Sequence, residues 1–230
     1  MNDMSRPDAI DPPYLYPDYK STRLRAPREP LLAVPVSVLD VPGPTIAEGF
    51  IAKGDNDLTK HGKSLPLGER MVLTGRLLDE DGRPVRRSLV EIWQANASGR
   101  YAHPGDQHDA PLDPNFVGIG RTFTDDEGRY RFVTIKPGAY PWQNHAYAWR
   151  PQHIHFSLLG NAPVQRLVTQ MYFPGDPLLA IDPVYNSVPD EAARRRMICA
   201  MALETGIEGV ALGYTFDIVL GGARSTPLGT

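Results

Sequence analysis

RTFTDDEGRYRFVTI, residues 121–135, decides the fold class of this chain. Runs rich in β-branched and aromatic residues lie on either side of a turn at Asp125-Asp126-Glu127-Gly128. The pattern predicts a β-hairpin, which ends at the structure-breaking Lys136-Pro137-Gly138.

The same design occurs upstream, where the sequence predicts another hairpin. It comprises Met71–Leu78, a turn over residues 79–82, and Pro84–Trp93. Short strands at this spacing predict an all-β fold with a β-sandwich core. Further strands are expected at residues 153–159, 166–173 and 214–220.

The rest of the chain is expected to form one helix and an extended arm. Asp190 and Glu191 suit a helix start, which predicts a helix from Pro189 to about Leu203. Residues 1–66 are rich in proline and show no sustained periodicity. We expect them to form an extended arm that docks on the core or on a partner subunit, whereas residues 67–230 form the sandwich domain.

Composition excludes several classes of protein. The 230 residues contain 24 Lys and Arg against 27 Asp and Glu, so a net charge of −3 offers no basic face for nucleic acid. No apolar run is long enough for a membrane partner or a membrane span. Cys199 is the single cysteine, and the first residues lack the apolar stretch of a secretory signal. A cytoplasmic location is therefore expected.

Two histidines in the run Arg150-Pro151-Gln152-His153-Ile154-His155 indicate a metal site. Alternate residues of a strand point to the same face, so His153 and His155 would lie roughly 6 to 7 Å apart along it. Neutral imidazole binds zinc, copper, iron and nickel, so the pair does not select the metal. Two half-buried strand histidines without a metal would give the same pattern.

The sequence spacing does not identify the remaining ligands. A zinc hydrolase would need a third histidine or a carboxylate, and a ferrous oxygenase would need two histidines and one carboxylate. The candidates, none favoured by spacing, are His61, His103, His108, His145, Asp106, Asp109 and Asp113.

Longer motifs make the chain resemble the intradiol ring-cleaving catechol dioxygenases. They extend over about a third of the chain, and weaker similarity covers nearly all of it. The motifs are Leu73–Arg76, Val90–Asn96, Gly99–Tyr101, Ala110–Phe116, Ile135–Trp142 and Trp149–Phe156, with weaker matches at Pro17–Lys20 and Phe216–Leu220.

The resemblance implies that Tyr101, Tyr140, His153 and His155 bind one non-haem Fe(III) per chain. Phenolate is a hard anionic donor and suits ferric rather than ferrous iron. The implied reaction takes a catechol and O2 to a muconate, in the β-ketoadipate route of aromatic degradation. Tyr140 would leave the metal and accept a substrate proton.

Other positions match the family's substrate pocket. Arg150 would stabilise negative charge on the substrate ring, although strand alternation predicts that it faces away from His153. Val184 stands where the family often has isoleucine, and His108 matches a variable position that is left out of the site. The remaining implied pocket residues are Tyr19, Trp142 and Gln170.

Substrate and partner follow from the branch of the family. The proline-rich arm replaces the helical dimerisation segment of catechol and hydroxyquinol enzymes, which favours the protocatechuate branch. There an iron-bearing chain pairs with a related α chain that lacks the ligands. Catechol or hydroxyquinol remain alternative substrates, and a metal hydrolase, a ferrous oxygenase or a transthyretin-like binding sandwich without iron remain alternative classes.

Overall fold

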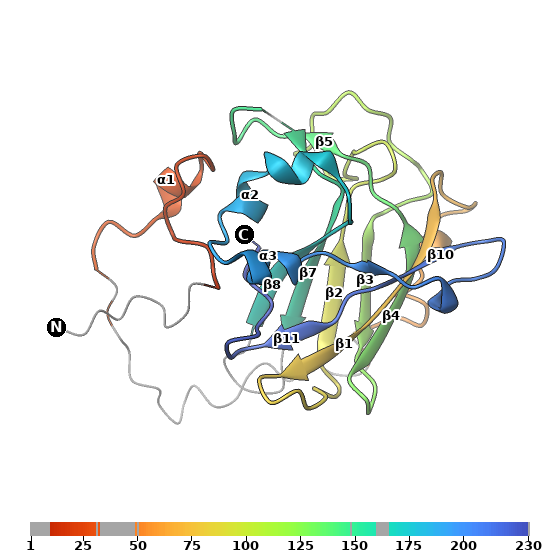
Figure 1. Ribbon diagram of the computed structural model, residues 1–230. Helices are drawn as coiled ribbons and strands as arrows, with labels where there is room; N and C mark the ends of the chain where they lie inside the picture. The colour runs from red at the N-terminus through yellow and green to blue at the C-terminus, as the bar shows by residue number, and fades with distance from the viewer. Residues whose placement is uncertain are drawn as a thin grey trace.

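The structure is a computed structural model that describes residues 10–30, 32, 49, 51–147, 149–159 and 166–229. Strands of two main sheets run through the body of the molecule, and the short helix α1 (Thr22–Arg25) lies to one side of them (Figure 1). Within the described residues no helix has the length and apolar character that crossing a bilayer requires.

The first sheet is built around β1 (Arg70–Asp79), its longest strand. Strand β4 (Arg129–Ile135) pairs antiparallel with β1, whereas β10 (Leu212–Thr215) and β11 (Ile218–Leu220) pair with it in parallel. The short β9 (Ala200–Met201) extends the sheet from β10.

The second sheet carries the histidine pair. Its order is β3 (Ile119–Phe123), β2 (Leu89–Trp93), β7 (His153–Leu159) and β8 (Arg166–Tyr172), with antiparallel neighbours throughout. A separate ribbon of β5 (Tyr140–Pro141) and β6 (Trp149–Arg150) precedes β7.

Alternating side chains of both sheets form one hydrophobic core. Leu73 and Phe132 from the first sheet, and Ile92 and Phe156 from the second, are completely buried in the same cluster. Burial of such side chains between two sheets defines a sandwich. The predicted all-β sandwich is therefore confirmed.

Both predicted hairpins pair only beside their turns, where an antiparallel bridge joins Leu78 to Pro84 and the backbone N–H of Asp125 donates to the Arg129 carbonyl. Beyond the turns the predicted pairing is wrong. Strands β1 and β2 belong to different sheets, as do β3 and β4. The turns form as expected: the backbone N–H of Gly128 donates to the Asp125 carbonyl, and that of Gly82 to the Asp79 carbonyl. However, each turn joins strands of different sheets, and turn residues do not determine which sheet a strand enters.

The predicted strand 214–220 is interrupted between β10 and β11. The side chain of Asp217 accepts the hydrogen bond from the backbone N–H of Arg76 at 2.8 Å, which replaces a backbone partner. The chain approaches so closely here that a Cβ on Gly75 would lie 2.0 Å from the Phe216 carbonyl oxygen. Only glycine fits this crossing.

The predicted helix at 189–203 is much shorter in the structure. Its start is correct, because Asp190 caps α3 (Glu191–Arg195) by accepting from the backbone N–H of Ala193. Residues after the helix pair with the edge of β8: Tyr172 donates to Met197, and Cys199 donates to Tyr172. This sheet contact ends the helix.

Several short helical elements were not predicted. Besides α1, they are α2 (Pro183–Asn186) and the 3₁₀ helices η3 (Leu58–Lys60), η4 (Pro177–Ala180) and η5 (Leu203–Thr205).

Several described residues of the N-terminal segment contact the rest of the chain. The backbone N–H of Lys20 donates to the Asn144 carbonyl, and Ile10 packs beside Tyr172 and Met197. Leu58 is completely buried in the main core. Residues 1–9, 31, 33–48 and 50 of the predicted arm lie outside the described residues, and the division of the chain at residue 66 stays a prediction.

Candidate metal centre and substrate cavity

The two histidines of β7 face the same side, as the sequence predicts. His153 lies opposite Tyr172 of β8, and His155 lies opposite Trp93 of β2. The Nε2 atoms of the two histidines are 3.2 Å apart. Both rings therefore direct one nitrogen to a common point.

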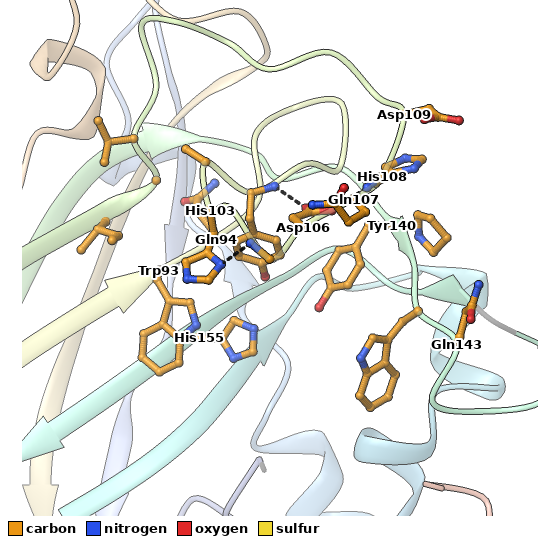
Figure 2. A pocket seen from close by; sticks show the side chains of 18 residues that line it. Trp93, Gln94, His103, Asp106, Gln107, His108, Asp109, Tyr140, Gln143 and His155 are labelled. Atoms are coloured by element: carbon orange, nitrogen blue, oxygen red, sulfur yellow. Dashed lines mark hydrogen bonds between the residues drawn. The ribbon is translucent and has the colours of Figure 1, made fainter. Parts of the chain in front are cut away.

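Two tyrosines from other segments approach the histidines. The Tyr140 hydroxyl, from β5, lies 3.3 Å from His153 Nε2. The Tyr101 and Tyr140 rings meet edge to face, with centroids 5.4 Å apart. Tyr101 belongs to the loop after β2, and its backbone N–H donates to the Asp106 carboxylate at 2.8 Å. The four predicted ligands thus come together (Figure 2 shows Tyr140 and His155).

Burial keeps the histidines neutral. Desolvation, followed by the charge of Arg150, lowers the pKa of His155 to about 3 and that of His153 well below its ordinary value. His153 Nδ1 lies 2.7 Å from the Pro151 carbonyl, so it carries the proton and leaves a lone pair on Nε2. Neutral imidazole with a lone pair is the form that binds a metal.

The Tyr101 hydroxyl is buried and has no hydrogen-bond partner among the described residues. Desolvation raises the pKa of Tyr101 well above its ordinary value, and the neighbouring Tyr140 raises it further. An unsatisfied buried hydroxyl costs about 1–3 kcal/mol. A cation bound between the four side chains would supply the missing partner, and a set of two phenols and two imidazoles suits a hard trivalent metal.

Arg150 lies next to His153 in the cluster of candidate ligands. Its side chain is 2% exposed and forms a salt bridge with the completely buried Asp182, with NH2 2.9 Å from Oδ2. Burial alone would lower the pKa of Arg150, but the Asp182 carboxylate outweighs it and raises the pKa above its ordinary value. The guanidinium therefore stays charged.

The expectation that Arg150 faces away from His153 is wrong, because NH1 lies 3.2 Å from His153 Nε2. Arg150 ends β6 and His153 begins β7, with Pro151 and Gln152 between the two strands. Strand alternation does not continue across this break.

A cavity of about 790 Å³ opens in front of the tyrosines and histidines. Tyr101, Tyr140, His155 and Trp142 line it, together with Trp93 (Figure 2). A cavity of this volume accepts a small aromatic molecule.

Tyr19, Gln170 and Val184, predicted as pocket residues, do not line the cavity, and neither does Arg150. Tyr19 packs its ring edge against Trp142, with centroids 5.0 Å apart. Gln170 and Val184 are buried, at 3% and 2% exposure. His108, which the prediction left out, does line the cavity, as does His103.

The remaining candidate ligands have other roles or positions. The Asp113 carboxylate accepts from the backbone N–H of Leu67 at 2.7 Å, and His145 Nε2 lies 2.8 Å from the Trp149 carbonyl. Asp106 holds the loop that carries Tyr101, and Asp109 lines the cavity with His103 and His108. Within the described chain no three side chains among His, Cys, Asp and Glu gather into a metal-binding group.

Sequence reasoning missed two residues of this region. Trp93 stacks on His155, and Asp182 pairs with Arg150. Trp93 belongs to the motif Val90–Asn96, which is distant from His155 in the sequence. It reaches His155 only because β2 pairs with β7. Asp182 precedes Pro183, a pattern that indicates a helix start but not an arginine partner.

Fold and site together define a β-sandwich protein with a cluster of two tyrosines and two histidines, in which His153 is buried and the other three are half-buried. Comparison with known families supports a more specific assignment. Residues 41–222 match the family described as "Dioxygenase", and residues 4–37 match the family "Protocatechuate 3,4-dioxygenase beta subunit N terminal". The chain therefore belongs to the intradiol ring-cleavage dioxygenase family.

Relatives at the sequence level agree with this membership. The protocatechuate 3,4-dioxygenase beta chain of Burkholderia cepacia is 58% identical over 219 residues, which cover 94% of this chain and 93% of the relative. The protocatechuate 3,4-dioxygenase alpha chain of Pseudomonas putida is 34% identical over 69% of this chain and 75% of its own length.

Solved structures show the same fold. The dioxygenase domain of a carbohydrate-binding fusion protein from Streptomyces sp. SirexAA-E covers 79% of this chain and 99% of that domain, with a TM-score of 0.52 and 29% identity. The 3-chlorocatechol 1,2-dioxygenase of Rhodococcus opacus 1CP covers 81% of this chain and 70% of that chain, with a TM-score of 0.56 and 21% identity. The family uses non-haem iron.

Proposed function

We propose that this chain catalyses the intradiol cleavage of protocatechuate (3,4-dihydroxybenzoate) by O2, giving 3-carboxy-cis,cis-muconate at a non-haem Fe(III). The observation that carries this proposal is the convergence of Tyr101, Tyr140, His153 and His155 beside a cavity of about 790 Å³, which all of them except His153 line. The 58% identity to a protocatechuate 3,4-dioxygenase beta chain supports the choice of substrate.

The four converging side chains would hold one iron per chain. His153 would bind through Nε2, because its Nδ1–H donates to the Pro151 carbonyl, and His155 through the Nε2 atom that lies 3.2 Å from that of His153. The two phenolates would offset two of the three positive charges. Bound there, Fe(III) would act as the electron acceptor that makes a coordinated catechol ring reactive towards O2.

The protein's own groups would prepare the substrate. Tyr140 lines the cavity, so its phenolate oxygen is placed to accept a proton from a catechol hydroxyl. Arg150 would stabilise the resulting negative charge without a change of its own protonation. Trp142 would form the wall of the cavity, and Tyr19 supports it through ring contact.

Gln170 and Val184 do not line the cavity and would support residues that do or that act on the substrate. Gln170 accepts a hydrogen bond from Arg150 NH2 at 2.7 Å, so it helps to hold the guanidinium. Val184 is buried in the first turn of α2 and would help to hold the protein wall behind the substrate.

We propose that this chain assembles with an α chain of protocatechuate 3,4-dioxygenase into a hetero-oligomer. The support is the beta-chain relative together with a recognisable alpha-chain relative. The cavity opens to the surface beside the half-exposed Val117 and Ile119, which a partner could cover. The proposed compartment is the cytoplasm.

A visible absorption spectrum combined with an iron assay tests the proposal. The purified protein is measured anaerobically with and without protocatechuate, after co-expression with an α chain and iron. We expect a broad band from phenolate-to-Fe(III) charge transfer that shifts when protocatechuate is added. A colourless, iron-free protein under these conditions would contradict the proposed function and favour a binding sandwich.

A further inference from the structure

We infer that Asp182 is a positioning residue, which turns one edge of the Arg150 guanidinium towards the candidate metal site. The inference rests on the proposed function and extends it to a residue that does not line the cavity. Asp182 would act through Arg150 and would not touch the substrate.

The hydrogen bonds of Arg150 divide its guanidinium into two edges. Asp182 Oδ2 accepts from Nε at 3.0 Å and from NH2 at 2.9 Å, so the carboxylate binds the guanidinium side-on. NH2 also donates to Gln170 Oε1 at 2.7 Å and to the Tyr172 hydroxyl at 3.0 Å. The Nε and NH2 donors are thus all engaged by Asp182, Gln170 and Tyr172.

The NH1 edge is left for the site. NH1 lies 3.2 Å from His153 Nε2, the atom that carries the lone pair. Once that nitrogen binds a metal, it can no longer accept from NH1, and the NH1 hydrogens become available to an anionic ligand next to the metal. Without Asp182 the side-chain torsions of Arg150 could change and turn a different edge of the guanidinium towards the candidate metal site.

A second contact packs the guanidinium against an aromatic ring. Its central carbon lies 5.0 Å from the ring centroid of Trp142, which lines the cavity. The ring contact and the Asp182 salt bridge together restrict the orientation of the guanidinium and therefore where NH1 points.

Asp182 also joins Arg150 to the start of α2. Its Oδ1 accepts from the backbone N–H groups of Val184 at 2.7 Å and Tyr185 at 3.2 Å. The same carboxylate therefore sets the position of Val184, a proposed pocket residue, relative to Arg150. A shift of Asp182 would move both.

The test is a double-mutant cycle in the iron-loaded αβ complex. Asp182→Asn keeps an oxygen for capping α2 but places an amide against the Arg150 donors. We expect a loss of kcat/KM of roughly 10- to 100-fold, as for a misplaced catalytic group, with iron content unchanged. In an Arg150→Leu background the same substitution should have little further effect, because the group it positions is gone.

Asp190→Asn is the matched control, because Asp190 caps α3 in the same way and lies outside the site. It should leave kcat and KM unchanged. Asp182→Glu, which retains the charge but moves the carboxylate, provides a second variant if Asp182→Asn folds poorly. The melting temperature of each metal-free variant separates a loss of stability from a loss of positioning.

Two results would overturn the inference: unchanged kcat and KM in both folded Asp182 variants, or an undiminished effect of Asp182→Asn in the Arg150→Leu background. A wild-type complex that binds iron but does not cleave the ring of protocatechuate would overturn the proposed function instead. In that case the anaerobic dissociation constant of protocatechuate, measured for the same variants, still decides whether Asp182 acts through Arg150.

Discussion

The indole of Trp93 lies parallel to the imidazole of His155, with ring centroids 4.7 Å apart and an interplanar angle of 4°. The two residues are opposite each other on β2 and β7, so the sheet itself sets this stacking. A flat ring against His155 limits its rotation and orients Nε2 towards the other candidate ligands.

We expect Trp93→Leu to weaken metal binding while preserving the fold. The smaller side chain cannot hold the His155 ring plane, and loss of a group that orients a ligand typically lowers metal affinity about 10- to 100-fold. The rate of iron transfer to a chelator measures the effect. The control is Trp149→Leu, at a tryptophan that is 45% exposed. Equal chelation rates for Trp93→Leu and the wild type would contradict the prediction.

Tyr101→Phe should have opposite effects with and without metal. In the metal-free protein the substitution removes a buried hydroxyl that lacks a partner, so stability should stay unchanged or rise by about 1 kcal/mol. With iron supplied, the variant should show a weaker and shifted phenolate-to-Fe(III) band, because only the Tyr140 phenolate remains, and should lose most of its activity.

Urea unfolding of the metal-free protein and the visible spectrum after iron loading measure the two effects. Tyr147→Phe is the control, because Tyr147 is 67% exposed. A clear loss of stability in metal-free Tyr101→Phe would show that the hydroxyl has a partner in the protein.

The sequence predicted part of this site from local pattern alone. Alternation along a strand placed His153 and His155 on one face, because both belong to a single uninterrupted strand. Tyr101 and Tyr140 could be selected only by resemblance, since they come from a loop and a separate ribbon whose approach depends on the whole fold. The same limit explains why Asp182 was missed.

The errors in the fold have a similar cause. The turn residues around Gly82 and Gly128 were recognised correctly, because turn geometry depends on a few neighbouring residues. Whether the chain then pairs back or crosses to the other sheet depends on core packing between distant strands. Likewise, contact with the edge of β8 ended the helix after Arg195.

Asn144→Ala should loosen the attachment of α1. The Asn144 side chain accepts from the backbone N–H of Ser21 at 2.8 Å and donates to the Ser21 hydroxyl at 2.9 Å. Its loss should speed trypsin cleavage in α1 and raise KM for protocatechuate about threefold, with kcat nearly unchanged, because Tyr19 supports Trp142 less well.

Limited proteolysis and steady-state kinetics of the αβ complex provide the measurements. Asn56→Ala is the matched control, since its amide donates to the Arg131 carbonyl away from the cavity. If both variants are cleaved at the wild-type rate, Asn144 does not hold α1 in place.

Cys199 should make the protein less stable at alkaline pH. Burial raises the pKa of its thiol to about 12, so the folded chain keeps a proton that the unfolded chain loses above about pH 8.5. Its contribution to stability is complete below that pH and declines as pH rises towards 12. Between pH 7.5 and 10 the metal-free wild type should lose about 1–2 kcal/mol more than Cys199→Ala. Urea unfolding at both pH values measures the difference. Equal losses of unfolding free energy in the wild type and Cys199→Ala would contradict the prediction that the Cys199 thiol causes the loss.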